Sequence, residues 1–271
     1  MTLGTITALP QPLLAVRGLT VQYKTADHLV TAVHRVSFDV HRGDRFVILG
    51  PSGCGKSTLL KAIAGFIRPV EGDIHLETRP IRKAGPDRIM VFQEFDQLLP
   101  WKTVRENIVF PLVENGLSRE EAQARADSYL PRVGLTKFAD LFPHMLSGGM
   151  KQRVAIARAM ALESKILLMD EPFAALDALT RRQMQDEILR LWEEIGFTLI
   201  FVTHSIEEAV IVGSRVLLLS PHPGRVRAEL NVPAALSERG GEAQTALGQR
   251  IHRLLFGVAE AAELQRASSH E

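Results

Sequence analysis

Apolar and polar positions follow a strand pattern in the first third of the chain. Residues 14–23 are apolar and β-branched, and Val36, Phe38 and Val40 alternate with polar residues as a half-buried strand does. Residues 45–49 form a short run, apolar from Phe46 to Leu49, that enters a glycine-rich turn. This pattern predicts two longer strands followed by one buried strand.

The pattern changes to helical signals after the turn and again in the middle of the chain. Residues 56–66 predict a helix, and 72–76 and 88–92 predict further strands. Helical signals then dominate 103–161, where Ser118 and Glu121 have the spacing of a capping box that opens a helix toward Tyr129. The middle of the chain is therefore expected to be a helical insertion.

Sheet signals return after the insertion and alternate with helices. Strands are predicted at 165–170, 198–203 and 216–219, with a helix over 178–195 and a short one before the last strand. Strands that alternate with helices indicate a parallel sheet covered by helices. The Ala- and Glu-rich tail from about residue 233 predicts one or two peripheral helices.

Composition narrows the class of protein. The 271 residues are 46% hydrophobic and 23% charged, which is typical of a globular chain, and the formal net charge is +1. This balance argues against broad electrostatic capture of nucleic acid, so no nucleic-acid partner is expected. Cys54 is the single cysteine, which excludes an internal disulfide and suits a reducing compartment.

Targeting and membrane signals are not visible in the sequence. Residues 1–12 lack a basic start followed by an apolar core, and no stretch reaches the about 18 continuous apolar residues of a membrane helix. The nearest candidate, 209–219, is interrupted by Gly213, Ser214 and Arg215. A soluble chain is expected, with any membrane role acting through a partner.

One motif predicts a phosphate-binding loop. Residues 50–57 fit the pattern G-x-x-x-x-G-K-[ST] and lie between the predicted buried strand and the predicted helix. Glycines let backbone N–H groups wrap phosphate, and the helix N-terminus adds partial positive charge. Lys56 would reach the terminal phosphates and Ser57 would bind Mg²⁺. The predicted nucleotide site comprises Gly50, Pro51, Ser52, Gly53, Cys54, Gly55, Lys56, Ser57 and Thr58.

A second strand ends in two acids. The apolar run 166–169, which follows Lys165, leads into Asp170 and Glu171, at a strand end where ligands of such sheets bind. Asp170 is predicted to join the Mg²⁺ shell, and Glu171 to polarise an attacking water. The alternative, a solvated acidic turn, is weakened by the phosphate loop.

The segment Leu146-Ser147-Gly148-Gly149-Met150 resembles the signature of the ABC ATPase family, which usually reads LSGGQ. Further family positions match in order over residues 14–220. Resemblance implies that Tyr23 stacks on adenine, that Gln93 senses Mg²⁺ and water, that Asp177 crosses between partners, and that His204 contacts the γ-phosphate. Met150 in place of glutamine and Ala174 in place of a common serine are small departures.

This resemblance implies a fold and a way of working. The expected fold is an α/β P-loop NTPase with a parallel-sheet core, an N-terminal antiparallel β part and an inserted α-helical subdomain. The expected boundaries are 13–232 for the ATPase domain, about 95–160 for the insertion and 233–271 for a helical tail. One phosphate loop and one signature per chain imply a homodimer that encloses ATP and Mg²⁺, with Ser147, Gly148 and Gly149 completing the partner's site.

The sequence Leu98-Leu99-Pro100-Trp101 resembles importers of nitrate, taurine and aliphatic sulfonates. The resemblance implies membrane permease subunits, an indirectly acting periplasmic solute-binding protein, and a peripheral location on the cytoplasmic face of the inner membrane. Phe95, Leu98, Leu99 and Trp101 are candidates for docking the permease, although Trp101 could instead anchor the helical insertion. The cargo itself is not encoded in these residues.

Three alternatives remain open at this point. A non-transport ABC ATPase acting on nucleic acid or ribosomes would share the motifs, but such chains usually carry coiled-coil insertions or two cassettes. A phosphoryl-transferring kinase would have no use for the signature. Cys54 is either a reactive thiolate favoured by the helix N-terminus or a small filler side chain.

Overall fold

The computed structural model describes residues 11–24, 28–92, 97–233 and 241–268, with side chains up to residue 257. Its first sheet is antiparallel, with the order β2-β1-β4-β5. The strands are β1 (Leu14–Lys24), β2 (Leu29–Val40), β4 (Glu71–Leu76) and β5 (Arg79–Pro80). This sheet corresponds to the predicted N-terminal β part, and β5 is an addition to it.

The second sheet carries the candidate site. Its order is β10-β9-β3-β8-β7-β6, with β10 antiparallel to β9 and the other pairs parallel. The strands are β3 (Arg45–Leu49), β6 (Arg88–Val91), β7 (Ile166–Asp170), β8 (Thr198–Thr203), β9 (Arg215–Leu219) and β10 (Val226–Asn231). Leu49 pairs with Thr203, and Asp170 with Val202. The carboxyl ends of β3, β7 and β8 therefore lie side by side.

Both faces of this sheet are buried along its central parallel strands β3, β7, β8 and β9, which explains their continuous apolar runs. In β3, Val47 and Leu49 pack into one core cluster, while Phe46 and Ile48 pack into the other. The second cluster also contains the buried face of α1 (Lys56–Ala64), whose neighbours are strands of both sheets. Helix α1 is thereby fixed directly behind the loop that follows β3.

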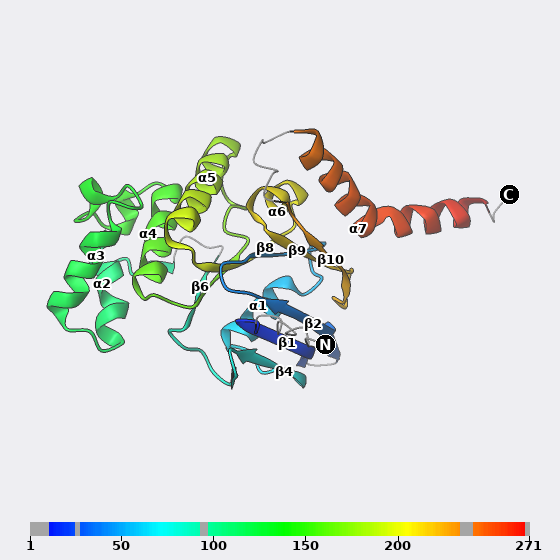
Figure 1. Cartoon of the computed structure of the whole chain (residues 1–271), viewed down its shortest axis with the longest axis horizontal. Coiled ribbons are helices and arrows are strands. Elements are labelled where there is room, and N and C mark those ends of the chain that lie inside the picture. The colour runs from blue at the N-terminus through cyan, green and yellow to red at the C-terminus, as the bar shows by residue number, and fades with distance from the viewer. Residues whose placement is uncertain (1–10, 25–27, 93–96, 234–240, 269–271) are drawn as a thin grey trace, which may run out of the picture.

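The inserted helices form an arm at one end of the molecule (Figure 1). The arm consists of α2 (Val104–Glu114), α3 (Arg119–Tyr129) and α4 (Gly148–Ala161), with 3₁₀ turns at Thr136–Phe138 and Pro143–Met145. The predicted capping box of Ser118 and Glu121 is confirmed, and Thr103 and Glu106 form a second one before α2. Helix α4 also contacts β6, which joins the arm to the sheet.

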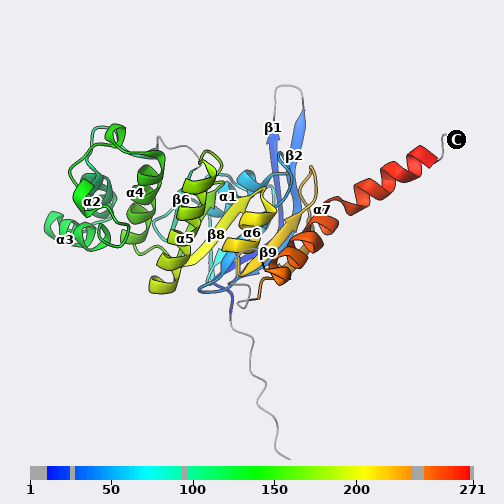
Figure 2. The same ribbon diagram turned by 90° about the horizontal axis from the view of Figure 1, so that it is seen from above.

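The remaining helices are α5 (Ala178–Ile195), α6 (Ile206–Val212) and α7 (Glu242–Ser268). Ile251 and Leu255 are buried and join the first part of α7 to the sheet region, while its later part extends away from the body (Figures 1 and 2). The predicted peripheral tail is thus a single helix in the described structure.

Among the described helices, none combines the length and the apolar character that a membrane span requires. The predicted fold class, a parallel α/β core with an antiparallel N-terminal part and a helical insertion, is confirmed.

Candidate functional site: a phosphate loop facing an acidic strand end

The phosphate loop connects β3 to α1 in a shape that requires glycine. Gly55 has φ +97°, and a Cβ built there would lie 2.5 Å from the carbonyl oxygen of Ala32. Any other residue would therefore clash with backbone as well as strain its own conformation. Gly53 also has positive φ, +77°, with open space around it. The loop thus exposes backbone N–H groups at the N-terminus of α1, where anions bind.

Lys56 is folded over this loop. Its side chain is buried, and Nζ donates hydrogen bonds to the carbonyl oxygens of Gly50 at 2.9 Å and Pro51 at 3.0 Å. Nζ also lies 3.6 Å from Oε1 of Glu171. A cation held in this position stands at the N-terminus of α1 and faces the acidic end of β7, so it can neutralise a phosphate bound between them.

Ser57 and Asp170 meet across the site. The Ser57 hydroxyl donates a 2.8 Å hydrogen bond to Oδ1 of Asp170, the last residue of β7. Burial raises the pKa of the Asp170 carboxyl, and the Ser57 hydrogen bond opposes that rise. A hydroxyl and a carboxylate oxygen are the hard donors that Mg²⁺ prefers, so this pair fits a magnesium site. Gln93, the third predicted ligand, lies outside the described residues.

Glu171 occupies the centre of the group. Its φ is +44°, in the left-handed region that non-glycine residues rarely adopt, and its N–H is bonded to the Val202 carbonyl oxygen at 3.0 Å. Its Oε2 lies 2.9 Å from Nδ1 of His204. An ionised carboxylate can only accept, so a hydrogen bond between these two atoms requires a proton on Nδ1 of His204. Glu171 is therefore held between a lysine and a histidine, as a water-orienting carboxylate requires.

Tyr23 and Thr58 mark the other side of the loop. The Tyr23 hydroxyl donates a 3.0 Å hydrogen bond to Oγ1 of Thr58 on α1, and the tyrosine side chain is partly exposed. An aromatic ring beside the loop is available to stack on a base, which is compatible with the role implied for Tyr23. Stacking itself stays a prediction.

The signature residues and Asp177 lie outside this group and cap helices. The Ser147 hydroxyl accepts a 3.3 Å hydrogen bond from the N–H of Met150, and a Cβ built on Gly149 would lie 3.2 Å from the Thr180 methyl carbon. Asp177 accepts from the N–H groups of Leu179 and Thr180, both at 3.0 Å. Hydrogen bonds, that of the Thr180 hydroxyl first, lower the pKa of Asp177. Both Ser147 and Asp177 are exposed and accessible to another chain.

Of the two interpretations open for Cys54, the reactive thiolate is not supported by its surroundings. The side chain is 1% exposed, and burial raises the pKa of the thiol more than the nearby Lys56 lowers it. Desolvation therefore outweighs the helix N-terminus, and Cys54 stays a thiol at neutral pH. The filler interpretation is favoured.

Two residues next to this site were missed by sequence reasoning. Glu208 in α6 is 6% exposed and bonded to Thr203, and Arg181 in α5 lies beside it. Glu208 is one of two adjacent acids at the start of a short helix, and the sequence gives no signal as to which one is buried.

Comparison with known proteins identifies the family. The sequence description of the ABC transporter family matches residues 33–174, which span the phosphate loop, the signature and both acids. The chain belongs to the ABC transporter family. The resemblance drawn from the motifs is thereby confirmed.

Individual relatives of this ABC protein share most of its length. The taurine import ATP-binding protein TauB of Rhizobium johnstonii is 53% identical over 203 residues, which cover 75% of this chain and 77% of that protein. The protein of the same name from Yersinia pestis is 46% identical over 220 residues, covering 81% and 84%. The dimeric post-hydrolysis structure of the ATP-binding cassette MJ0796 with ADP and Pi superposes with a TM-score of 0.70 at 33% identity, covering 82% and 99%.

Proposed function

We propose that this chain is the ATP-hydrolysing subunit of an importer that takes up a small anion of the sulfonate class. The observation that carries the proposal is the position of Glu171, with Lys56 Nζ at 3.6 Å on one side and His204 Nδ1 at 2.9 Å on the other. A carboxylate so placed, at the carboxyl end of β7 and facing a phosphate loop, suits hydrolysis of a terminal phosphate.

The chemistry is transfer of the γ-phosphoryl group to water, which depends chiefly on positioning and charge neutralisation. Lys56 and the loop N–H groups would bind the phosphates, and Glu171 would orient the attacking water and accept its proton. His204, by donating Nδ1–H to Glu171, would fix the carboxylate and leave Nε2 toward the phosphate. Ser57 and Asp170 would hold Mg²⁺, which when bound offsets the phosphate charge.

We also propose that two copies work together. The phosphate loop contacts Asp170 and Glu171 of its own chain at the end of β7. The helix caps formed by Ser147 and Asp177, in contrast, are exposed and available to a second chain. A head-to-tail pair would let Ser147, Gly148 and Gly149 of one chain cover the nucleotide on the other, giving two equivalent sites. The similar cassette MJ0796 is described as dimeric, which supports this arrangement.

The permease would dock on the arm, near Trp101. Trp101 is 70% exposed and therefore does not anchor the core of the helical insertion, while Phe110 is 39% exposed. Large exposed aromatic side chains are enriched where proteins associate. Leu98, in contrast, is 3% exposed, so the expectation that it contacts a permease is wrong. Leu99 is half-buried, and Phe95 lies outside the described residues.

Cargo and location are proposed from the relatives. The two relatives described above are named as taurine import proteins, which supports a sulfonate as cargo, carried by a permease and a periplasmic solute-binding protein. The ATPase subunit would sit on the cytoplasmic face of the membrane and never contact the cargo. Nitrate, the other small anion with a related importer, is the competing cargo.

An uptake assay tests this function. A strain lacking the gene would be complemented with wild type or with Lys56→Ala, and uptake of labelled taurine, an alkanesulfonate and nitrate would be compared. We expect wild type alone to restore sulfonate uptake. Restored nitrate uptake would transfer the assignment to that anion, and restoration of none of the three by wild type would contradict the proposed import.

A further inference from the structure

A buried carboxylate lies directly behind His204. Glu208, in the first turn of α6, is 6% exposed, and its Oε2 accepts a 2.5 Å hydrogen bond from the hydroxyl of Thr203. The same hydroxyl oxygen accepts from the N–H of Ser205 at 3.0 Å, and Ser205 Oγ accepts from the N–H of Glu208 at 3.3 Å. The backbone on both sides of His204 is thus tied to Glu208.

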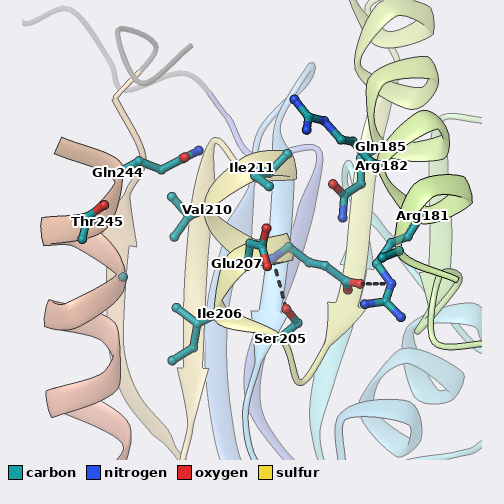
Figure 3. Close-up of a pocket in the computed structure, with 13 residues that line it drawn as sticks. Arg181, Arg182, Gln185, Ser205, Ile206, Glu207, Val210, Ile211, Gln244 and Thr245 are labelled. Carbon is teal, nitrogen blue, oxygen red and sulfur yellow. Dashed lines mark hydrogen bonds and ion pairs between the residues drawn. The ribbon is translucent and has the colours of Figure 1, made fainter. Parts of the chain in front are cut away.

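Arg181 supplies the opposing charge. Its Nε lies 3.7 Å from Oε1 of Glu208, and Figure 3 shows Arg181 reaching from α5 toward α6, where a dashed line marks this contact. Burial raises the pKa of the Glu208 carboxyl, while Thr203 and Arg181 act against the rise. A carboxylate this buried is costly without such partners, so their arrangement around it is specific.

The same guanidinium also holds the loop between Glu171 and Asp177. Arg181 Nη2 donates a 2.9 Å hydrogen bond to the Leu176 carbonyl oxygen, and Nε a longer one of 3.4 Å to that of Phe173. An arginine fork can bind two carbonyls and a carboxylate together, whereas a lysine offers one compact ammonium. Arg181 therefore joins the segment that carries Glu171 and Asp177 to the turn that carries His204.

We propose that Arg181 and Glu208 act as one positioning unit for ATP hydrolysis, fixing His204 against Glu171 and holding Asp177 in place for the partner subunit. The inference rests on the ATPase reaction proposed above. Neither residue touches the phosphate loop among the described contacts, so the unit acts on the hydrolytic half of the site and leaves nucleotide binding to Lys56 and its loop.

The surroundings of the pair provide matched controls. Arg181 and Glu208 line a cleft of about 680 Å³ between α5, α6 and α7, and the adjacent residues Arg182 and Glu207 line the same cleft (Figure 3). Removing the charge of Arg182 or Glu207 changes the electrostatic field of the cleft as the loss of Arg181 or Glu208 would. It leaves intact the connection between the Glu171–Asp177 segment and the turn that carries His204.

A double-mutant cycle on the full chain tests the unit. Glu208→Gln keeps the shape and the Thr203 hydrogen bond but removes the charge opposite Arg181, and Arg181→Gln removes the fork. We expect each single variant to lower kcat about tenfold, as misplacement of a catalytic group does, with the Kd for ATP changed less than about twofold. The double variant should lose no more than the worse single one, because both cut the same connection.

Further variants separate positioning from general damage. Arg182→Gln and Glu207→Gln should keep wild-type kcat, and Arg181→Lys should lose activity like Arg181→Gln because it keeps the charge but not the fork. The proposal would be overturned if the kcat losses of the two single variants multiplied in the double variant. It would also be overturned if the Kd for ATP rose in step with the fall in kcat. Should Glu208→Gln fail to fold in a thermal melt, Arg181→Lys decides: full activity there overturns the proposal. An inactive wild type would contradict the ATPase function itself and this inference with it.

Discussion

Lys56 Nζ and Glu171 Oε1 lie 3.6 Å apart, so the cation of the phosphate loop and the acid that directly follows β7 face one another across the candidate site. The two residues are far apart in sequence and are brought together because β3 and β7 both pair with β8 in parallel. Mutation can distinguish the roles proposed for the two residues, which are phosphate binding for Lys56 and water orientation for Glu171.

Replacing Lys56 with Ala should abolish tight ATP binding. The variant removes the only side-chain cation that the described contacts place on the loop carbonyls of Gly50 and Pro51, and the loop N–H groups alone bind the phosphates weakly. Titration with a fluorescent ATP analogue should show an affinity loss of at least about tenfold. Unchanged affinity would show that Lys56 does not contact the nucleotide.

Hydrolysis should depend on a divalent cation held by Ser57 and Asp170. Chelation should stop turnover, and added Mg²⁺ should restore it. Asp170→Asn keeps the side-chain shape but weakens the cation site, because a neutral amide is a poorer ligand than a carboxylate. Its activity should therefore need a higher Mg²⁺ concentration than that of wild type, which a Mg²⁺ titration of the ATPase rate measures. If Asp170→Asn and wild type showed the same Mg²⁺ dependence, Asp170 would not be a ligand of the cation.

Cys54 should react slowly with thiol reagents. Its side chain is buried and its pKa is raised by burial, so little thiolate is present at pH 7 and reagent access is restricted. Alkylation by a maleimide, followed by mass spectrometry, should be at least about tenfold slower than that of a small free thiol, and Cys54→Ser should keep its ATPase activity. Rapid labelling that ATP prevents would restore the reactive-thiolate interpretation.

Trp101 and Leu98 should give opposite phenotypes although they are three residues apart. Leu98→Ala empties a core position and should lower the free energy of unfolding by about 2 to 5 kcal/mol. Trp101→Ala removes an exposed side chain and should change stability by about 0.5 kcal/mol or less. Urea unfolding measures both. Trp101→Ala should also keep soluble ATPase activity and lose transport, whereas intact transport would exclude Trp101 from the permease contact.

Much of the core fold could be predicted because its signals are local. The strands β3 and β8 and the helix α5 have the bounds that the apolar pattern predicted, since buried parallel strands are continuous apolar runs and Gly196 ends the helix in a left-handed cap. The edge strand β10 was missed because most of its residues are exposed and its alternation of apolar and polar residues is short, so that pairing with β9 is what defines it as a strand.

The residues that join the segment carrying Glu171 and Asp177 to the turn carrying His204 could not be predicted. Arg181 and Glu208 meet because α5 and α6 pack side by side, and nothing in either helix specifies that neighbour. The left-handed backbone of Glu171 likewise depends on its bond to Val202 in the next strand. The burial of Leu98 and the exposure of Trp101 are set by the turn before α2, where both residues are apolar in sequence.

The pairing of two chains around ATP is the central claim and has a direct measurement. Glu171→Gln should bind ATP and fail to hydrolyse it, so any ATP-bound pair would accumulate. Size-exclusion chromatography with light scattering should give twice the monomer mass for Glu171→Gln with Mg²⁺ and ATP, and the monomer mass for the same protein with ADP. The double variant Glu171→Gln with Ser147→Arg, which blocks the signature helix N-terminus, should stay monomeric. Glu171→Gln that remains monomeric at high concentration with ATP, or that hydrolyses ATP at the wild-type rate, would contradict the account.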